Sequence, residues 1–127
     1  EFRRVLFRSM DVLIESADSA PIDENQFKLL ADSPEEMRYV LQVFFSLAEQ
    51  KIDLLKLSRR KGEEAQWKSH AHYLKGSAAS MGMKPLSELC RKAEISHAEP
   101  YEYKNQLLAA IMAELARART QAEALVA

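Results

Sequence analysis

The segment AHYLKGSAASMG, residues 71–82, holds the side chains best suited to chemistry in this chain. His72 is followed three residues later by Lys75, and Gly76 comes directly after that lysine. An imidazole that is unprotonated near pH 7 is a competent nucleophile toward activated phosphorus. A glycine inside a helix lowers the stability of the helix by roughly 1 kcal/mol relative to alanine, so Gly76 needs a reason other than helix formation.

Helical periodicity predicts that His72 lies on the outer face of a helix. At about 100° per residue, the apolar side chains of this segment fall within roughly 40° of the direction of Trp67. These apolar residues are Trp67, Ala71, Leu74, Ala78 and Met81. On the same count His72 points roughly 140° away from Trp67, Gly76 about 180° and Ala79 about 120°. The small side chains of Gly76 and Ala79 therefore leave the approach to the imidazole clear.

Two lysines flank the same histidine. Lys68 is predicted to point about 100° from the direction of Trp67, and Lys75 about 80°. Phosphorylation of an imidazole adds nearly two negative charges, which nearby lysines partly offset. In an exposed setting each lysine contributes about 1 kcal/mol or less, so we expect Lys75 to tune phosphoryl transfer without being essential. Taken alone, His72 could also be a solvated surface histidine. Its small and cationic neighbours favour the other interpretation, a histidine that carries a phosphoryl group.

The remaining histidines and the one cysteine do not predict a metal site. His70 points roughly 60° from the centre of the apolar stripe, so we expect it at the flank of the helix, with a structural role. Metal-binding pairs on helices use spacings of three or four residues, which His70 and His72 lack. His97 is expected in a loop. A single cysteine, Cys90, excludes an intramolecular disulfide and a multi-cysteine zinc site, and its apolar neighbours predict burial. We therefore expect no metal and no cofactor in this chain.

The composition is that of one globular domain rich in helix. The chain has 127 residues, of which 47% are hydrophobic and 29% charged. Three glycines and four prolines are few, which favours long helices over a sheet with many turns. No apolar run approaches the roughly 18 residues of a membrane helix, and no signal peptide is evident. The sequence therefore predicts a cytoplasmic protein that does not enter a membrane.

The first nine residues, EFRRVLFRS, differ in character from the rest of the chain. They match the translation of a common sequencing-adaptor sequence, so we expect residues 1–9 to be a non-native scar and Met10 to be the natural start. An amphipathic basic arm is the alternative. Removal of their three arginines and one glutamate changes the net charge from −1 to −3. A mildly acidic domain without a basic stripe argues against nucleic acid as a partner. Residues 10–21 are expected to be a flexible lead-in to a domain that spans residues 22–127.

Capping signals predict where the first two helices begin. Asp23 is a suitable N-cap for a short helix, and Ser33 followed by Pro34 and by Glu36 is a stronger start signal for a long one. The apolar positions of the long helix continue to about Arg60, and Gly62 suits the position just after its end.

Three further helices follow with short connections. The third begins near Glu63 and stops at Gly82, the fourth begins at Pro85, and the last runs from about Tyr101 until it frays after Leu125. Short connections between long helices favour antiparallel packing. The sequence therefore predicts an all-α fold, namely an antiparallel up-down four-helix bundle with a short additional N-terminal helix.

The stretch from His72 to Glu94 resembles the histidine phosphotransfer (HPt) domains of multistep bacterial and fungal phosphorelays. The family pattern is His-x-Leu-Lys-Gly, small residues, a hydrophobic–Gly pair, a new helix and a Leu/Cys-rich segment that ends in Gln or Glu. The sequence AHYLKGSAASMGMKPLSELCRKAE follows this pattern without a gap. The helical pattern of residues 22–125 also fits the helical bundle of the family.

The resemblance implies a role for each residue of the motif. His72 would accept a phosphoryl group through Nε2 from an aspartyl phosphate and pass it to another aspartate. Lys75 matches the charge-compensating position, and Gly76 matches the position that gives clearance. Glu94 matches a Gln or Glu that holds the Nδ1–H of the histidine; alternatively it is a solvated carboxylate near a helix end.

The resemblance also implies the partners, which are receiver domains of response regulators and hybrid histidine kinases. Receivers dock around the histidine in this family, so Lys68, Ser69 and Ala79 are the expected contacts on its helix. The chain lacks a glycine-rich ATP site and the acidic cluster of a receiver. We therefore expect a monomeric phosphoryl carrier without kinase activity, and Mg²⁺ bound by the partner. The alternative is an HPt-like adaptor that binds receivers without carrying phosphate. The presence of the histidine, lysine and glycine of the motif argues against it, because an adaptor needs none of them.

Overall fold

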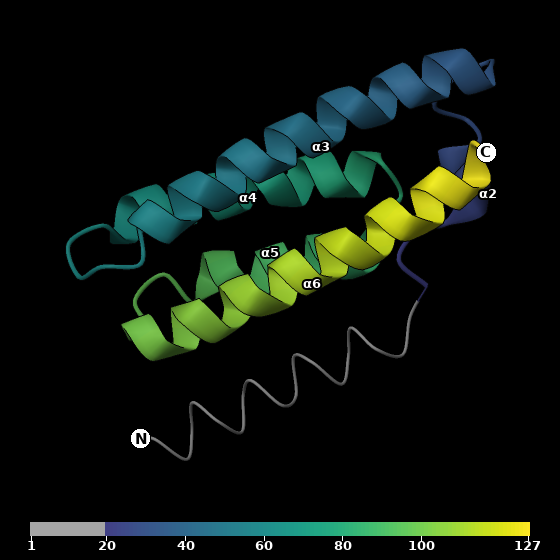
Figure 1. The fold of residues 1–127 in the computed structure, drawn as a ribbon. Coiled ribbons are helices and arrows are strands. Elements are labelled where there is room, and N and C mark those ends of the chain that lie inside the picture. Colours follow the sequence, from purple (N-terminus) through teal and green to yellow (C-terminus); the bar gives the residue numbers. More distant parts are fainter. Residues whose placement is uncertain (1–19) are drawn as a thin grey trace.

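The computed structural model describes residues 20–127, and this part of the chain is all-helical (Figure 1). This confirms the predicted all-α class for the described residues. The predictions for residues 1–9 and for most of the lead-in 10–21 lie outside the described residues. The helices are α2 (Glu24–Phe27), α3 (Pro34–Leu57), α4 (Glu64–Ser80), α5 (Lys84–Ile95) and α6 (Tyr101–Leu125).

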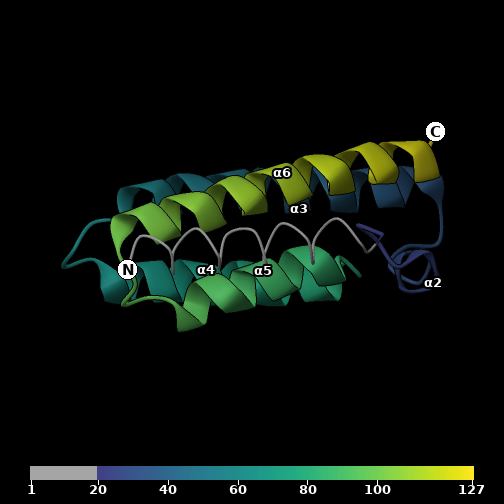
Figure 2. The same ribbon diagram turned by 90° about the horizontal axis from the view of Figure 1, so that it is seen from below.

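The four long helices of the described chain lie lengthwise beside one another, as both ribbon views show (Figures 1 and 2). α4 packs most extensively against α5, and α3 packs against α4. α6 completes the arrangement through contacts with α5 and with α3. The short helix α2 lies at the end of the molecule where α6 and the chain end (Figure 2). No helix in the described part has the length and the apolar character needed to span a bilayer.

The core lies between these helices and contains one cluster of buried apolar side chains. Its centre includes Trp67, whose indole Nε1 donates a hydrogen bond of 2.7 Å to the backbone carbonyl of Ala93. This bond ties α4 to α5 inside the core. Cys90 is fully buried, as predicted, and burial raises the pKa of its thiol to about 12. The thiol of Cys90 is therefore a packing group and not a reactive one.

The predicted helix starts are confirmed by their capping contacts. The Asp23 carboxylate accepts hydrogen bonds from the backbone N–H groups of Asn25 and Gln26 at the start of α2. The Ser33 hydroxyl accepts from the backbone N–H of Glu36 at 3.1 Å and begins α3. Each cap satisfies N–H groups that have no partner within the helix, which is why these short sequence signals predict where the helices begin.

The end of α3 differs from the prediction. The helix ends at Leu57, three residues before Arg60, because side chains satisfy its last carbonyls earlier. The Ser58 hydroxyl donates to the carbonyl of Leu54 at 2.7 Å, and Arg59 donates to the carbonyl of Lys56 at 3.1 Å.

Gly62 therefore does not cap α3, and its predicted place just after that helix was wrong. Gly62 has φ +98 and lies in the turn before α4, where its N–H donates to the carboxylate of Glu64 at 2.8 Å. The positive φ explains why a glycine stands there.

The predicted stop at Gly82 is confirmed. Gly82 has φ +74, and its N–H donates to the carbonyl of Ala79 while the next N–H, of Met83, donates to Ala78. This pair of bonds is a Schellman motif, which closes the C-terminal end of α4. The carbonyl of Gly82 also accepts from the backbone N–H of Asp23 at 2.9 Å. The turn thereby attaches α2 to the end of α4.

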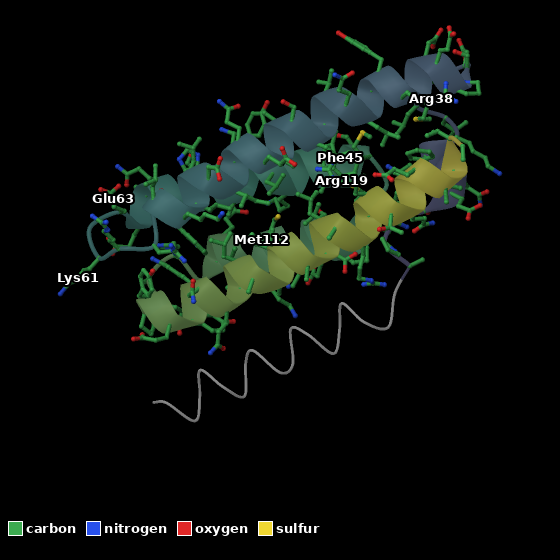
Figure 3. The ribbon with its side chains drawn as sticks, viewed as in Figure 1. Arg38, Phe45, Lys61, Glu63, Met112 and Arg119 are labelled. Atoms are coloured by element: carbon green, nitrogen blue, oxygen red, sulfur yellow. The ribbon has the colours of Figure 1, made fainter. Side chains whose placement is uncertain are left out.

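A groove runs between α3 and α6 and is crossed by long side chains. The guanidinium of Arg119 lies 4.3 Å from the ring centroid of Phe45 and donates to Glu49 at 2.7 Å. Figure 3 labels Phe45 and Arg119 side by side between the two helices. Apolar residues form part of the lining: Leu41, Phe45, Ala122 and Val126.

Candidate functional site

His72 lies on the exposed face of α4, as the helical projection predicts. Its side chain is 66% exposed, whereas the neighbouring Ala71 and Leu74 are fully buried. The apolar stripe of α4 faces α3 and α5 and holds the helix in place, so the opposite face carries the imidazole outward. The exposed ring is accessible to a macromolecular partner.

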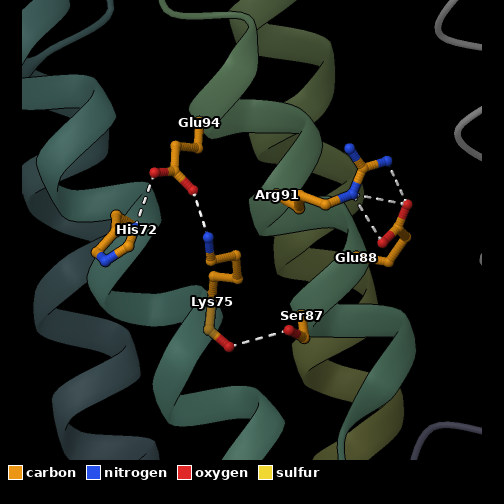
Figure 4. Close-up of polar contacts among 6 residues, drawn as sticks. All are labelled: His72, Lys75, Ser87, Glu88, Arg91 and Glu94. Carbon is orange, nitrogen blue, oxygen red and sulfur yellow. Dashed lines mark hydrogen bonds and ion pairs between the residues drawn. The ribbon is translucent and has the colours of Figure 1, made fainter.

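Glu94, in the last turn of α5, bridges His72 and Lys75, two candidate site residues of α4 (Figure 4). Its Oε2 lies 2.8 Å from His72 Nδ1, and its Oε1 accepts a hydrogen bond of 2.7 Å from Lys75 Nζ. The Glu94 side chain is only 16% exposed. One carboxylate therefore contacts both the imidazole and the ammonium group.

The electrostatics of Glu94 determine which ring nitrogen carries the proton. The hydrogen bond from Lys75, followed by that from His72, holds the pKa of the Glu94 carboxyl below its ordinary value, although desolvation acts in the opposite direction. An ionised carboxylate only accepts hydrogen bonds, so His72 Nδ1 must donate. In a neutral ring the Nδ1 proton leaves Nε2 with a free lone pair. The geometry therefore presents Nε2 as a nucleophile.

Gly76 is required neither by the backbone nor by packing in this structure. Its φ is not positive, unlike those of Gly62 and Gly82. A Cβ built at Gly76 would meet no described atom within 4 Å, apart from its chain neighbours and the backbone of its own helix. Ala79, one turn further on, is exposed. No large side chain at these two positions therefore covers the surface beside His72. That this clearance admits a partner protein stays a prediction.

Sequence reasoning missed Ser87, whose hydroxyl donates to the backbone carbonyl of Lys75 at 3.0 Å. This bond holds α5 against α4 within the site (Figure 4). Ser87, Arg91 and Glu94 recur at spacings of four and three, which places them on one face of α5. That spacing is the sequence signal that could have found Ser87. The guanidinium of Arg91 binds the carboxylate of Glu88, with Nε 3.0 Å from each oxygen.

The predicted docking residues on α4 are exposed. Lys68 and Ser69 lie on the turn before His72, and Ala79 lies toward the other end of α4. Tyr73 is also exposed, and Lys51 of α3 lies 4.3 Å from its ring centroid. The structure thus brings part of α3 beside the histidine, but docking itself stays a prediction.

His70 lies apart from His72, as the helical projection predicts. It is half-buried, and burial, together with the charge of Lys51, lowers its pKa. Within residues 20–127 no group of three or more His, Cys, Asp or Glu side chains could hold a metal ion.

Comparison with known proteins gives one match. The sequence model of the Hpt domain matches residues 40–125, which are more than half of the chain and include His72, Lys75, Gly76 and Glu94. No curated protein and no solved structure matches the chain.

Proposed function

Because this chain belongs to the Hpt domain family, we propose that it is a phosphorelay carrier that accepts a phosphoryl group on His72 from a receiver-domain aspartate and passes it to another receiver aspartate. Hpt domains carry phosphoryl groups in phosphorelays and interact with receiver domains. In this proposal Lys75 offsets the phosphoryl charge, Glu94 orients the ring, and Gly76 gives the partner clearance. Mg²⁺ would be bound by the receiver.

The observation that carries the proposal is the exposed side chain of His72, whose Nδ1 is held by Glu94 so that the lone pair is left on Nε2. The Nε2 lone pair attacks phosphorus, so that a nitrogen–phosphorus bond forms and the phosphorus–oxygen bond to the aspartate breaks. The electron pair of the broken bond leaves on the aspartate carboxylate. The ring then carries a positive charge, and the Glu94 carboxylate stabilises the proton on Nδ1. Onward transfer reverses these steps on a second aspartate.

The proposal extends to the architecture and the setting of the protein. The packing of α3 with α4, α4 with α5, and α6 with both α5 and α3 supports an antiparallel up-down four-helix bundle. The domain would span residues 22–127 and act as a cytoplasmic monomer, in which one exposed histidine serves successive receivers.

A phosphotransfer assay tests the proposal. The protein is incubated with a phosphorylated receiver domain and Mg²⁺, and we expect it to acquire an acid-labile, alkali-stable phosphoryl group. His72→Gln should abolish this label because the nucleophile is lost. His70→Gln is the matched control, since it removes a histidine two residues away on the same helix and should leave the label in place.

Two results would contradict the carrier function. One is equal labelling of wild type and His72→Gln. The other is receiver binding by the wild-type protein without any label, which would favour an adaptor.

A further inference from the structure

The groove between α3 and α6 has the size and the lining of a small-molecule site. Its volume is about 560 Å³, and ligand pockets in proteins have volumes of roughly 300–1,000 Å³. Its described lining residues lie on α3, on α6 and just after α6, whereas His72 and Glu94 lie on α4 and α5. The groove is therefore separate from the candidate phosphotransfer site.

Two arginines cross this groove in opposite directions. Arg38 of α3 donates a hydrogen bond of 2.9 Å to the carbonyl of Val126, just after α6. Arg119 of α6 donates to Glu49 of α3 at 2.7 Å, and a second hollow, of about 380 Å³, lies beyond that pair. Figure 3 labels Arg38 near the chain end and Arg119 further along the same two helices. From position 38 to position 49 α3 rises about 16 Å, so the groove is a compartment with a guanidinium group at each end.

The two crossings determine what kind of occupant fits. A helix of a partner protein, or of a second copy of this chain, needs an apolar groove that is open along several turns. Such a helix would have to displace Arg38 from Val126 and Arg119 from Glu49. A small molecule fits between the two arginines and leaves both contacts in place.

The free donors of Arg38 determine the charge of the occupant. A guanidinium has five N–H donors. Among the described residues Arg38 makes one hydrogen bond, to a neutral carbonyl, and no ion pair, whereas Arg119 is paired with Glu49. Guanidinium groups bind carboxylates through two parallel hydrogen bonds. Arg38 therefore favours an anionic group at its end of the groove.

We propose that the groove between α3 and α6 binds a free amphipathic carboxylate of the fatty-acid class, with its carboxylate on Arg38 and its apolar chain along Leu41 and Phe45. Glu123, which is exposed on α6, lines the same groove and opposes the binding of an anion. This site goes beyond the proposed phosphotransfer and does not depend on it.

Titration calorimetry with dodecanoate below its micellar concentration tests the charge preference. Dodecyltrimethylammonium carries the same chain with the opposite charge, and we expect dodecanoate to bind about tenfold more tightly. Arg38→Met should weaken dodecanoate binding about tenfold, and Glu123→Gln should strengthen it about twofold because a repulsion is removed. Arg60→Met is the matched control, since Arg60 is exposed in the turn before α4, and it should leave dodecanoate binding unchanged.

Filling the groove from its surface tests the place of binding. Ser46 is an exposed lining residue on α3, so Ser46→Phe should leave the fold intact, as circular dichroism would show, and weaken dodecanoate binding about tenfold or more. Gln50→Phe, one turn further along the exposed face of α3, is its control and should have no effect.

Several results would overturn the proposal. They are no binding of dodecanoate by the wild-type protein, equal binding of the two amphiphiles, equal losses from Arg38→Met and Arg60→Met, and unchanged binding by Ser46→Phe. Binding to phosphatidylglycerol vesicles without binding of free dodecanoate would identify a membrane surface instead. Self-association of the ligand-free protein that Ser46→Phe abolishes, measured by light scattering, would identify a second copy of the chain as the occupant.

Discussion

The contact between α4 and α5 and the contact between α3 and α6 are built from different kinds of side chain. Between α4 and α5 a buried indole donates directly to the backbone, from Trp67 to the carbonyl of Ala93 at 2.7 Å. Between α3 and α6 the long side chain of Arg119 reaches over Phe45 to Glu49. The first contact is a buried hydrogen bond to the backbone, and the second is made by a long side chain that lines a groove.

The difference shows where chemistry that depends on distance can be placed. Glu94 reaches His72 from another helix, so a small slide of α5 along α4 would break their 2.8 Å contact. Buried bonds to backbone carbonyls oppose such a slide because each would leave an unpaired polar group in the core. Long exposed arginines follow a slide by changing rotamer. The candidate site lies at the contact between α4 and α5, where the buried bond from Trp67 to Ala93 opposes sliding of one helix along the other.

The largest effect is expected from enlarging a buried alanine at each contact. Ala93→Leu should lower the free energy of unfolding by about 3 kcal/mol, because overpacking between α4 and α5 forces Trp67 or the helices to move. It should also abolish phosphotransfer by displacing Glu94. Ala122→Leu should lower stability by less than about 1 kcal/mol, since Ala122 lines the groove and the added atoms can occupy it. Urea denaturation measures both, and equal losses would contradict the contrast between the two contacts.

Removal of one polar contact from each side should give the next largest effect. Trp67→Phe removes the Nε1 donor and leaves the buried Ala93 carbonyl without that bond, at a loss of about 2 kcal/mol. Arg119→Met removes an exposed ion pair with Glu49 and should cost at most about 1 kcal/mol. Thermal unfolding of the two variants compares them. A larger loss from Arg119→Met would show that the α3–α6 contact is the more rigid one.

Two glycines of the α4 region should respond in opposite directions. Gly82→Ala should destabilise the protein by about 1 kcal/mol, because the residue has φ +74 and a Cβ would lie 3.3 Å from the carbonyl oxygen of Asp23. Gly76→Ala should stabilise it by roughly 0.5–1 kcal/mol, since the added Cβ points into open space on a helix. Chemical denaturation tests both signs.

Gly76→Gln separates clearance from folding. It should leave the helix intact, as circular dichroism would show, and slow phosphoryl transfer because a long side chain stands beside His72. Unchanged transfer kinetics would refute the role of Gly76 in clearance.

The smallest effect concerns two glutamates whose carboxyl pKa values are shifted in opposite directions. Burial raises the pKa of Glu114 on α6, which is 1% exposed, above its ordinary value despite the ion pair with Arg117. A raised carboxyl pKa contributes stability that is fully present below the ordinary value and is lost as pH rises through the folded value. Glu114→Gln should therefore gain stability relative to wild type as pH rises from 4 to 7, reaching about 1 kcal/mol or less.

Glu94 provides the comparison with the opposite sign. The pKa of Glu94 is lowered, chiefly by Lys75, so its contribution is present above the ordinary value and is lost as pH falls through the folded value. The stability deficit of Glu94→Gln should therefore shrink in acid. Denaturation of both variants at pH 4 and pH 7 compares the slopes, and slopes of the same sign would contradict the opposite environments.

Much of this fold follows from local signals in the sequence. Asp23 and Ser33 predict their helix starts because a side-chain cap involves residues only two or three positions apart. The exposure of His72 follows from helical periodicity, since burial of the apolar stripe fixes the direction of every other side chain on α4. The end of α3 was not predictable in the same way, because the sequence offers two possible end signals, Ser58 and Gly62. Only the structure shows that the Ser58 hydroxyl bonds to the last turn of the helix and that Gly62 lies in the following turn.

The sequence by itself thus determined the helices, the outward direction of His72 and the resemblance that pointed to Glu94. Only the tertiary structure decided that one carboxylate contacts both His72 and Lys75, and that Ser87 joins the two helices there. Periodicity fixes how a side chain is directed around its own helix axis, but it does not fix how far one helix lies along another. That offset is set by core packing between α4 and α5, with the bond from Trp67 to Ala93 inside it.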